Sequence, residues 1–179
     1  KRVLFLDGEI DEMLSSFLTR AFYVLSEVNQ PITLLISSSG GEVDCGKTII
    51  RAIKYAQSKG CIIEAEVRGF AMSMAAIILQ SADLRFASSD DIIMIHGGAG
   101  INVGDIRNRE ADLKLATRIM NDWSRFLAER NTSENEKYHS SDFWLEKFRD
   151  EYPNYFHGDE ALAAGLVDEL VDRKEEMDD

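Results

Sequence analysis

Residues 69–76 read Gly-Phe-Ala-Met-Ser-Met-Ala-Ala, and they join two apolar runs, residues 61–67 and residues 74–79. The first run has the length of a buried strand, and the second predicts a short buried helix. A turn from a strand into a helix lifts Ser73 out of the sheet, beside the N–H groups of the first helical turn. Such a setting favours a nucleophile whose product oxyanion needs donors. The same residues also fit a serine that only caps the helix.

Strands and helices alternate on both sides of this junction. Short apolar runs of strand character occupy residues 3–6, 32–36, 84–86 and 92–95. Asp11 is a candidate helix N-cap. Apolar residues then recur at helical spacing: Met13, Phe17, Ala21, Val24 and Val28. A second predicted helix carries four more: Val43, Ile49, Ile50 and Ile53. This alternation predicts an α/β fold of repeated βαβ units around a parallel sheet.

The composition narrows the class of protein. The length of 179 residues suits a single domain spanning 1–179. With 32 Asp+Glu against 20 Lys+Arg the formal net charge is −12, which argues against nucleic acid as a partner. No apolar run reaches the ~18 residues of a membrane span, and no signal peptide precedes the first strand, so we expect a cytoplasmic protein. Cys45 and Cys61 do not make a disulfide framework and are expected to be reduced.

A histidine follows one of the predicted strands. His96 ends the run of residues 92–95 and precedes two glycines. Open α/β sheets bind their ligands at the carboxyl ends of strands, so His96 is a candidate site residue. We interpret His139 and His157, in the polar and aromatic C-terminal part, as structural. No pair of His, Cys or carboxylate residues has the spacing of a zinc site, so we expect neither a metal nor a cofactor.

Gly40 and Gly41 follow the predicted strand of residues 32–36. They fit a tight turn, or a flexible backbone that offers an N–H to an oxyanion or pairs with an extended peptide. We do not expect this stretch to bind a nucleotide.

Residues 105–130 predict one long helix. Its apolar residues fall at spacings of 7, 3, 4, 3 and 4: Ile106, Leu113, Ala116, Met120, Trp123 and Leu127. This narrow, heptad-like seam is typical of a helix that packs on a partner as well as on its own core. A long helix that packs only on its own domain is the other interpretation.

Together these segments resemble the ClpP family, the proteolytic subunits of ATP-dependent Clp proteases, whose fold is shared with the crotonase superfamily. The resemblance is carried by five stretches in the family's order: residues 2–10 (RVLFLDGEI), 36–43 (ISSSGGEV) with Gly46, 69–76 (GFAMSMAA), 94–96 (MIH) and 159–168 (DEALAAGLVD). It implies a serine peptidase with Ser73 as nucleophile and His96 as general base. The backbone N–H groups of Gly41 and Met74 would form the oxyanion hole.

The resemblance also implies an assembly. The long helix would be the family's protruding handle, which interdigitates between two stacked heptameric rings to give a homo-oligomer of fourteen subunits. The barrel would enclose the active sites and admit unfolded polypeptides that an AAA+ unfoldase feeds into it.

The chain departs from the family at the third triad residue. Pro153 stands where the family has an aspartate, and it has no side-chain acceptor. Asn154 is next and could orient the imidazole as a neutral acceptor. Asp150 and Asp142 are the alternatives. His96 is also followed by two glycines where the family has Gln-Pro, so the chain looks like a divergent member.

Two other functions stay open from the sequence. A non-catalytic ring subunit that shapes the barrel would explain the missing aspartate. A crotonase-like acyl-CoA enzyme on the same fold would need oxyanion donors and no serine nucleophile.

Overall fold

The computed structural model describes residues 2–97 and 109–172 of the chain. Along the chain the elements are β1 (Val3–Ile10), α1 (Glu12–Leu25), β2 (Ile32–Gly41), α2 (Val43–Ser58), β3 (Ile63–Met72), α3 (Met74–Leu79), β4 (Leu84–Ala87) and β5 (Ile92–Ile95). The second part holds α4 (Arg109–Arg130), a 3-10 turn (Glu136–His139), α5 (Ser141–Arg149), β6 (Asn154–His157), α6 (Gly158–Ala163) and β7 (Glu169–Leu170). None of the described helices is both long and apolar enough to cross a membrane.

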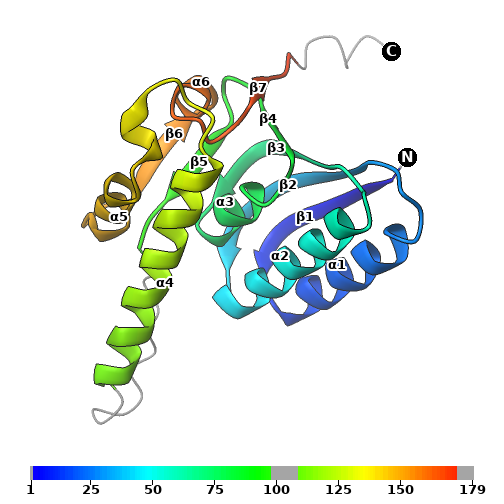
Figure 1. Cartoon of the computed structure of the whole chain (residues 1–179), viewed down its shortest axis with the longest axis horizontal. Coiled ribbons are helices and arrows are strands. Elements are labelled where there is room, and N and C mark those ends of the chain that lie inside the picture. Colours follow the sequence, from blue (N-terminus) through cyan, green and yellow to red (C-terminus); the bar gives the residue numbers. More distant parts are fainter. Residues whose placement is uncertain (1, 98–108, 173–179) are drawn as a thin grey trace.

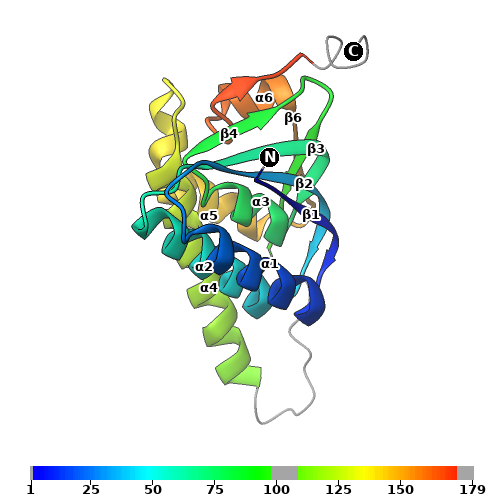
Figure 2. The same cartoon turned by 90° about the vertical axis from the view of Figure 1, so that its right-hand side faces the viewer.

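The strands form one mostly parallel sheet, as the alternation of the sequence predicts. Strands β1, β2, β3, β4 and β7 follow one another in this order, and all their pairings are parallel. The strand β5 is parallel to the last part of β3, and β6 is antiparallel to β5. Helices α1, α2 and α3 lie on one face of the sheet (Figures 1 and 2). The predicted α/β class is therefore confirmed.

The core lies between the sheet and these helices. The buried side of β2 carries Ile32, Leu34 and Ile36, and alternate residues between them are half-exposed. Alternation arises because only one face of the sheet is covered by α1, α2 and α3. Strands β2, β3 and β5 are thus supported by a closely packed apolar core.

Helix α1 begins as predicted, since the Asp11 carboxylate accepts a hydrogen bond from the N–H of Leu14 at 2.8 Å. Its predicted apolar stripe, however, is mostly exposed: Met13, Phe17 and Val24 face away from the core, and Val28 lies beyond the last turn. The buried side of α1 carries Leu18 and Phe22 instead. The helix is apolar on two adjacent sides, so spacing alone did not identify the buried one.

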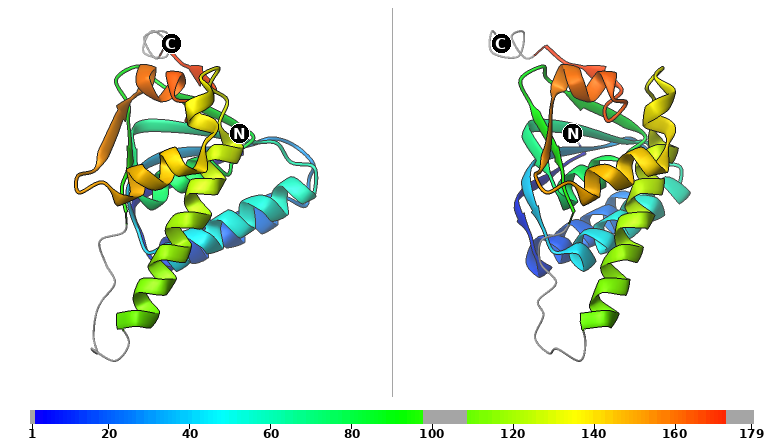
Figure 3. Two further views of the ribbon diagram at one scale, coloured as in Figure 1. Left: turned by 60° about the vertical axis from the view of Figure 1, so that its left-hand side comes forward. Right: turned by 90° about the vertical axis from the view of Figure 1, so that its left-hand side faces the viewer.

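The long helix predicted for residues 105–130 corresponds to α4, and residues 105–108 lie outside the described part of the chain. Its N-terminal end extends past the other described elements, while α5 lies beside its C-terminal half (Figures 1 and 3). Burial along the predicted apolar seam differs between the two halves of α4. Leu127 is 1% exposed, whereas Leu113 is 64% exposed.

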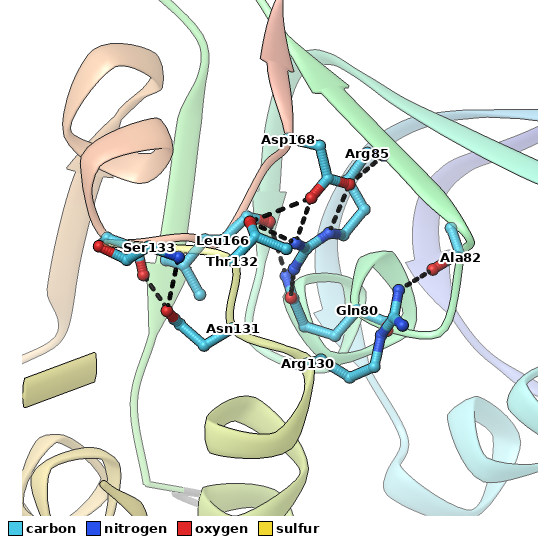
Figure 4. A network of polar contacts seen from close by, with 10 residues as sticks. Gln80, Ala82, Arg85, Arg130, Asn131, Thr132, Ser133, Leu166 and Asp168 are labelled. Carbon is cyan, nitrogen blue, oxygen red and sulfur yellow. Dashed lines mark hydrogen bonds and ion pairs between the residues drawn. The ribbon is translucent and has the colours of Figure 1, made fainter. Parts of the chain in front are cut away.

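A network of polar contacts anchors the C-terminal end of α4 (Figure 4). Arg85 on β4 is fully buried, and its guanidinium bonds to the Asp168 carboxylate at 2.6 and 3.0 Å and to the Thr132 hydroxyl at 3.1 Å. It also donates to the side chain of Gln80, which follows α3, and Arg130 donates to the Gln80 carbonyl at 3.0 Å. The end of α4 is thereby joined to the end of α3.

Candidate active site

Ser73 lies at the turn between β3 and α3 in a strained backbone conformation. Its φ is 53° and its ψ is −122°, and within the described residues no other non-glycine residue has a positive φ. Such conformations cost on the order of 1–3 kcal/mol and concentrate at functional sites. The Ser73 side chain makes no capping hydrogen bond to α3, so the capping interpretation is wrong. The hydroxyl is therefore available for another partner.

That partner is His96. The Nε2 atom of His96 lies 2.9 Å from the Oγ of Ser73, and both residues are half-exposed. Strand β5 positions both groups, because the Ser73 N–H donates to the Met94 carbonyl at 2.8 Å and His96 comes directly after β5. The structure brings together two residues that are 23 positions apart, in the geometry of a nucleophile and its general base.

Two glycines at the end of β2 complete the surroundings of Ser73. A Cβ atom built on Gly40 would lie 2.7 Å from the Cβ of Ser73 and 3.1 Å from the N of Met74. Gly40 also has a φ of +97°, which favours glycine. A Cβ on Gly41 would overlap the backbone of Ile10. The backbone of β2 at Gly40 therefore approaches Ser73 as closely as glycine allows, beside the N–H of Met74.

The Met74 side chain is held against α2. It is 3% exposed, and a Cβ on Gly46 would collide with its side chain. This contact fixes the first residue of α3, whose N–H stands next to Ser73. Of the two predicted oxyanion donors, Met74 directly follows Ser73, whereas Gly41 lies against the backbone of Ile10 and its neighbour Gly40 lies against Ser73.

The structure does not bring the predicted third residue into contact with His96. Asn154 opens β6 in register with Ile95, and its Nδ2 donates to the Lys147 carbonyl at 3.1 Å. Hydrogen bonds from Lys147 and Asn154 lower the pKa of Asp150 below its usual value, and Lys147 lies 3.1 Å from that carboxylate. Among the described residues, none of the hydrogen bonds made by Asn154, Asp150 or Asp142 reaches the imidazole.

Asp91 is a further candidate that the sequence did not indicate, and it lies directly before β5 and contacts β3. This carboxylate is buried and accepts hydrogen bonds from the N–H groups of Gly69 and Ser88. Its contacts with Gly69 and Ser88 run through backbone N–H groups, which leave no pattern in the sequence. Nor do His, Cys, Asp and Glu side chains of the described segments gather into a group of three that could hold a metal ion.

The fold and the site together define a mixed α/β protein with a serine–histidine pair where adjacent parallel strands end. The family model described as Clp protease matches residues 1–174. The chain therefore belongs to the Clp protease family, as its sequence motifs predict.

Individual relatives agree with this assignment. ATP-dependent Clp protease proteolytic subunit 2 of Pseudomonas aeruginosa is 25% identical over 182 residues, which cover 98% of this chain and 84% of that protein. The ATP-dependent Clp protease proteolytic subunit of Carsonella ruddii is 28% identical over 178 residues, covering 97% of this chain and 86% of that one. A solved structure, an asparagine-to-aspartate mutant of ClpP1 from Listeria monocytogenes, has a TM-score of 0.82 at 24% identity. The aligned region covers 97% of this chain and 93% of the ClpP1 chain, and the two chains share the same fold.

Proposed function

We propose that this member of the Clp protease family is a serine peptidase subunit that hydrolyses unfolded polypeptides. The observation that carries the proposal is the contact of 2.9 Å between Ser73 Oγ and His96 Nε2 at a strained strand-to-helix turn. Membership of a family of proteases supports hydrolysis of peptide bonds as the reaction.

The reaction follows from this geometry. His96 takes the proton of Ser73 as Oγ attacks the scissile carbonyl, and it later gives that proton to the leaving amine. The N–H groups of Met74 and Gly41 stabilise the tetrahedral oxyanion, each at roughly 3–4 kcal/mol. Water then cleaves the acyl-enzyme, with His96 again as base. No metal or cofactor takes part in this scheme.

Asn154 is the residue that we propose to orient His96. Its Nδ2 is engaged by the carbonyl of Lys147, so its Oδ1 is the group suited to accept from the Nδ1–H of the imidazole. A neutral acceptor fixes the tautomer but stabilises the imidazolium less than a carboxylate does. In the working state Asn154 must therefore approach His96 more closely than in this structure.

We further propose that the subunit works inside a cytoplasmic barrel of two heptameric rings, joined by the handles and served by an AAA+ unfoldase. The apolar residues near the N-terminal end of α4 support a role in assembly, since Leu113 and Leu115 are 64% and 57% exposed. The relatives are named as proteolytic subunits of an ATP-dependent protease, which supports an unfoldase as partner.

A non-catalytic ring subunit is the second candidate. One observation favours it, because no described residue donates to or accepts from the Nδ1 of His96. An imidazole without an orienting partner is a poor general base.

A fluorophosphonate probe separates the two candidates. We expect it to label the assembled wild-type protein at Ser73, and the Ser73→Ala variant to lose both labelling and hydrolysis of short fluorogenic peptides. The Ser16→Ala variant, which changes an exposed serine of α1, should keep both. A folded, assembled wild-type protein that neither reacts with the probe nor cleaves peptide would make the non-catalytic subunit the better conclusion.

A further inference from the structure

Strands β3 and β5, which lead to Ser73 and His96, are tied together by one buried carboxylate just before their pairing begins. We propose that Asp91 is a positioning residue that sets the register of β3 against β5 and so places Ser73 within reach of His96. The expected effect on kcat rests on the proposed function as a serine peptidase, whereas the expected effect on the distance between Ser73 and His96 does not.

Strand β3 changes partner in the middle. Its first half pairs with β4 up to Glu66, which faces Phe86, and its second half pairs with β5 from Phe70, which faces Ile92. Against β2 the register also shifts here, since Ile36 faces Val67 and Ser38 faces Ala71. Strand β3 therefore holds two more residues than β2 in this interval, and the pairing of its first half does not set the position of its second half.

Asp91 supplies the missing constraint at this irregularity. Its Oδ1 accepts from the N–H of Gly69 at 2.7 Å, and its Oδ2 accepts from the N–H of Ser88 at 2.7 Å. The Asp91 N–H in turn donates to the Ser88 carbonyl at 3.1 Å, which closes the turn between β4 and β5. The side chain is 2% exposed, and a buried carboxylate persists where charge-assisted hydrogen bonds satisfy it.

The contact between Asp91 and Gly69 lies a few residues before both Ser73 and His96. Gly69 precedes Ser73 by four residues on one strand, and Asp91 precedes His96 by five residues on the other. Beyond this contact the pairing of β3 with β5 continues to Met72 and Met94, and Ser73 comes next in the chain. A slip of one residue moves a strand by about 3.3 Å. A misplacement of about 1 Å at a catalytic group can cost on the order of 100-fold in rate.

The test compares Asp91→Asn with a matched control, Asp83→Asn. Asparagine keeps the shape of the side chain but has one acceptor in place of two, so it cannot hold both N–H groups. Asp83 makes the same kind of contact at the opposite end of β3, where its carboxylate accepts from the N–H of Ile63 at 2.8 Å. The control makes the same change of side chain far from Ser73, and it weakens a similar hydrogen bond by removing the charge of its acceptor.

Crystal structures of both variants give the decisive measurement. In Asp91→Asn we expect the distance between Ser73 Oγ and His96 Nε2 to exceed the hydrogen-bond range, and in Asp83→Asn we expect it to stay near 2.9 Å. With fluorogenic peptides, kcat of Asp91→Asn should fall by about 10- to 100-fold with KM nearly unchanged. Asp83→Asn should lose thermal stability and keep its kcat.

The outcomes are distinguishable. If Asp91→Asn keeps both the serine–histidine contact and the wild-type kcat, the inference is wrong and Asp91 only stabilises the turn. If the wild type cleaves nothing, the proposed function fails, and the distances alone decide the inference. Should Asp91→Asn not fold, Asp91→Glu retains both acceptors on a longer side chain, and we expect a folded protein with a longer contact and a kcat about 10-fold lower. Wild-type geometry in that variant would overturn the inference.

Discussion

Gly40 has no Cβ atom, and this allows its backbone to lie against Ser73. A Cβ there would lie 2.7 Å from the Cβ of Ser73 and 2.8 Å from the carbonyl oxygen of Met72. We expect Gly40→Ala to reduce the rate of Ser73 labelling by about 100-fold or more, because the turn that carries the hydroxyl must shift. Labelling kinetics with the fluorophosphonate probe measure this effect.

Gly8→Ala is the matched control. Gly8 also has a positive φ, of +79°, but a Cβ there would meet nothing within 4 Å. It should show the cost of backbone strain alone, about 1 kcal/mol of stability, with labelling preserved. Equal loss of labelling in both variants would mean that backbone strain, and not the close approach to Ser73, governs the site.

The pair of Ser73 and His96 could be predicted because each follows a strand whose apolar run is visible in the sequence. Parallel strands end at one edge of a sheet, so two such residues are expected to meet there. Asp91 could not be predicted in the same way, since it contacts Gly69, 22 residues away, through a backbone N–H that every residue has. The orientation of His96 by Asn154 stays a prediction, because the hydrogen bonds of Asn154 run to other groups.

Helix α4 is buried on its apolar side along only part of its length. Its C-terminal half packs on the core through Leu127, whereas Leu113 and Leu115 near its beginning are largely exposed. The heptad-like spacing predicted one continuous seam, and no spacing rule says where the supporting domain ends. Only the packing shows that the first part of the seam has no cover among the described residues.

A substitution on this helix tests whether a second subunit covers it. We expect Leu113→Ser to leave the fold of the subunit intact and to shift the oligomer toward smaller species, because it removes apolar area only from the contact between subunits. Arg118→Ser is the control on the same helix, since its side chain is 81% exposed and charged. Sedimentation velocity measures the distribution, and an unchanged oligomer in Leu113→Ser would argue against this contact.

At the scale of the whole molecule, one buried ion pair holds the C-terminal part to the sheet. Burial alone would raise the pKa of Asp168, but the hydrogen bonds and charge of Arg85 outweigh it and lower that pKa below its usual value. A depressed carboxyl pKa means that the folded state favours the ionised form. The stabilisation is thus present above the unfolded pKa of about 3.9 and is lost as the pH falls through the folded one.

The Asp168→Asn variant makes this dependence measurable. At pH 7 we expect it to be less stable than the wild type by about 3–5 kcal/mol, because the fully buried Arg85 loses its counter-charge. The difference should begin to shrink as the pH falls below about 4 and should be smallest below the lowered pKa of Asp168, where the wild-type carboxyl is protonated as well. Urea unfolding at a series of pH values measures both. A difference that stays constant down to low pH would show that the ion pair is not its source.

The anchoring of α4 at one end has a mechanical consequence. A helix of 22 residues is about 33 Å long, whereas α3 with six residues is about 9 Å long. Gln80 follows the last residue of α3, and Arg130, the last residue of α4, donates to the Gln80 carbonyl. A common rotation of about 3° around this point therefore moves the far end of α4 by about 2 Å but moves Met74 by only about 0.5 Å. The far end of α4 therefore has more freedom to adjust to a neighbouring subunit, while the turn that carries Ser73 moves by less than the ~1 Å that the proposed catalysis would tolerate.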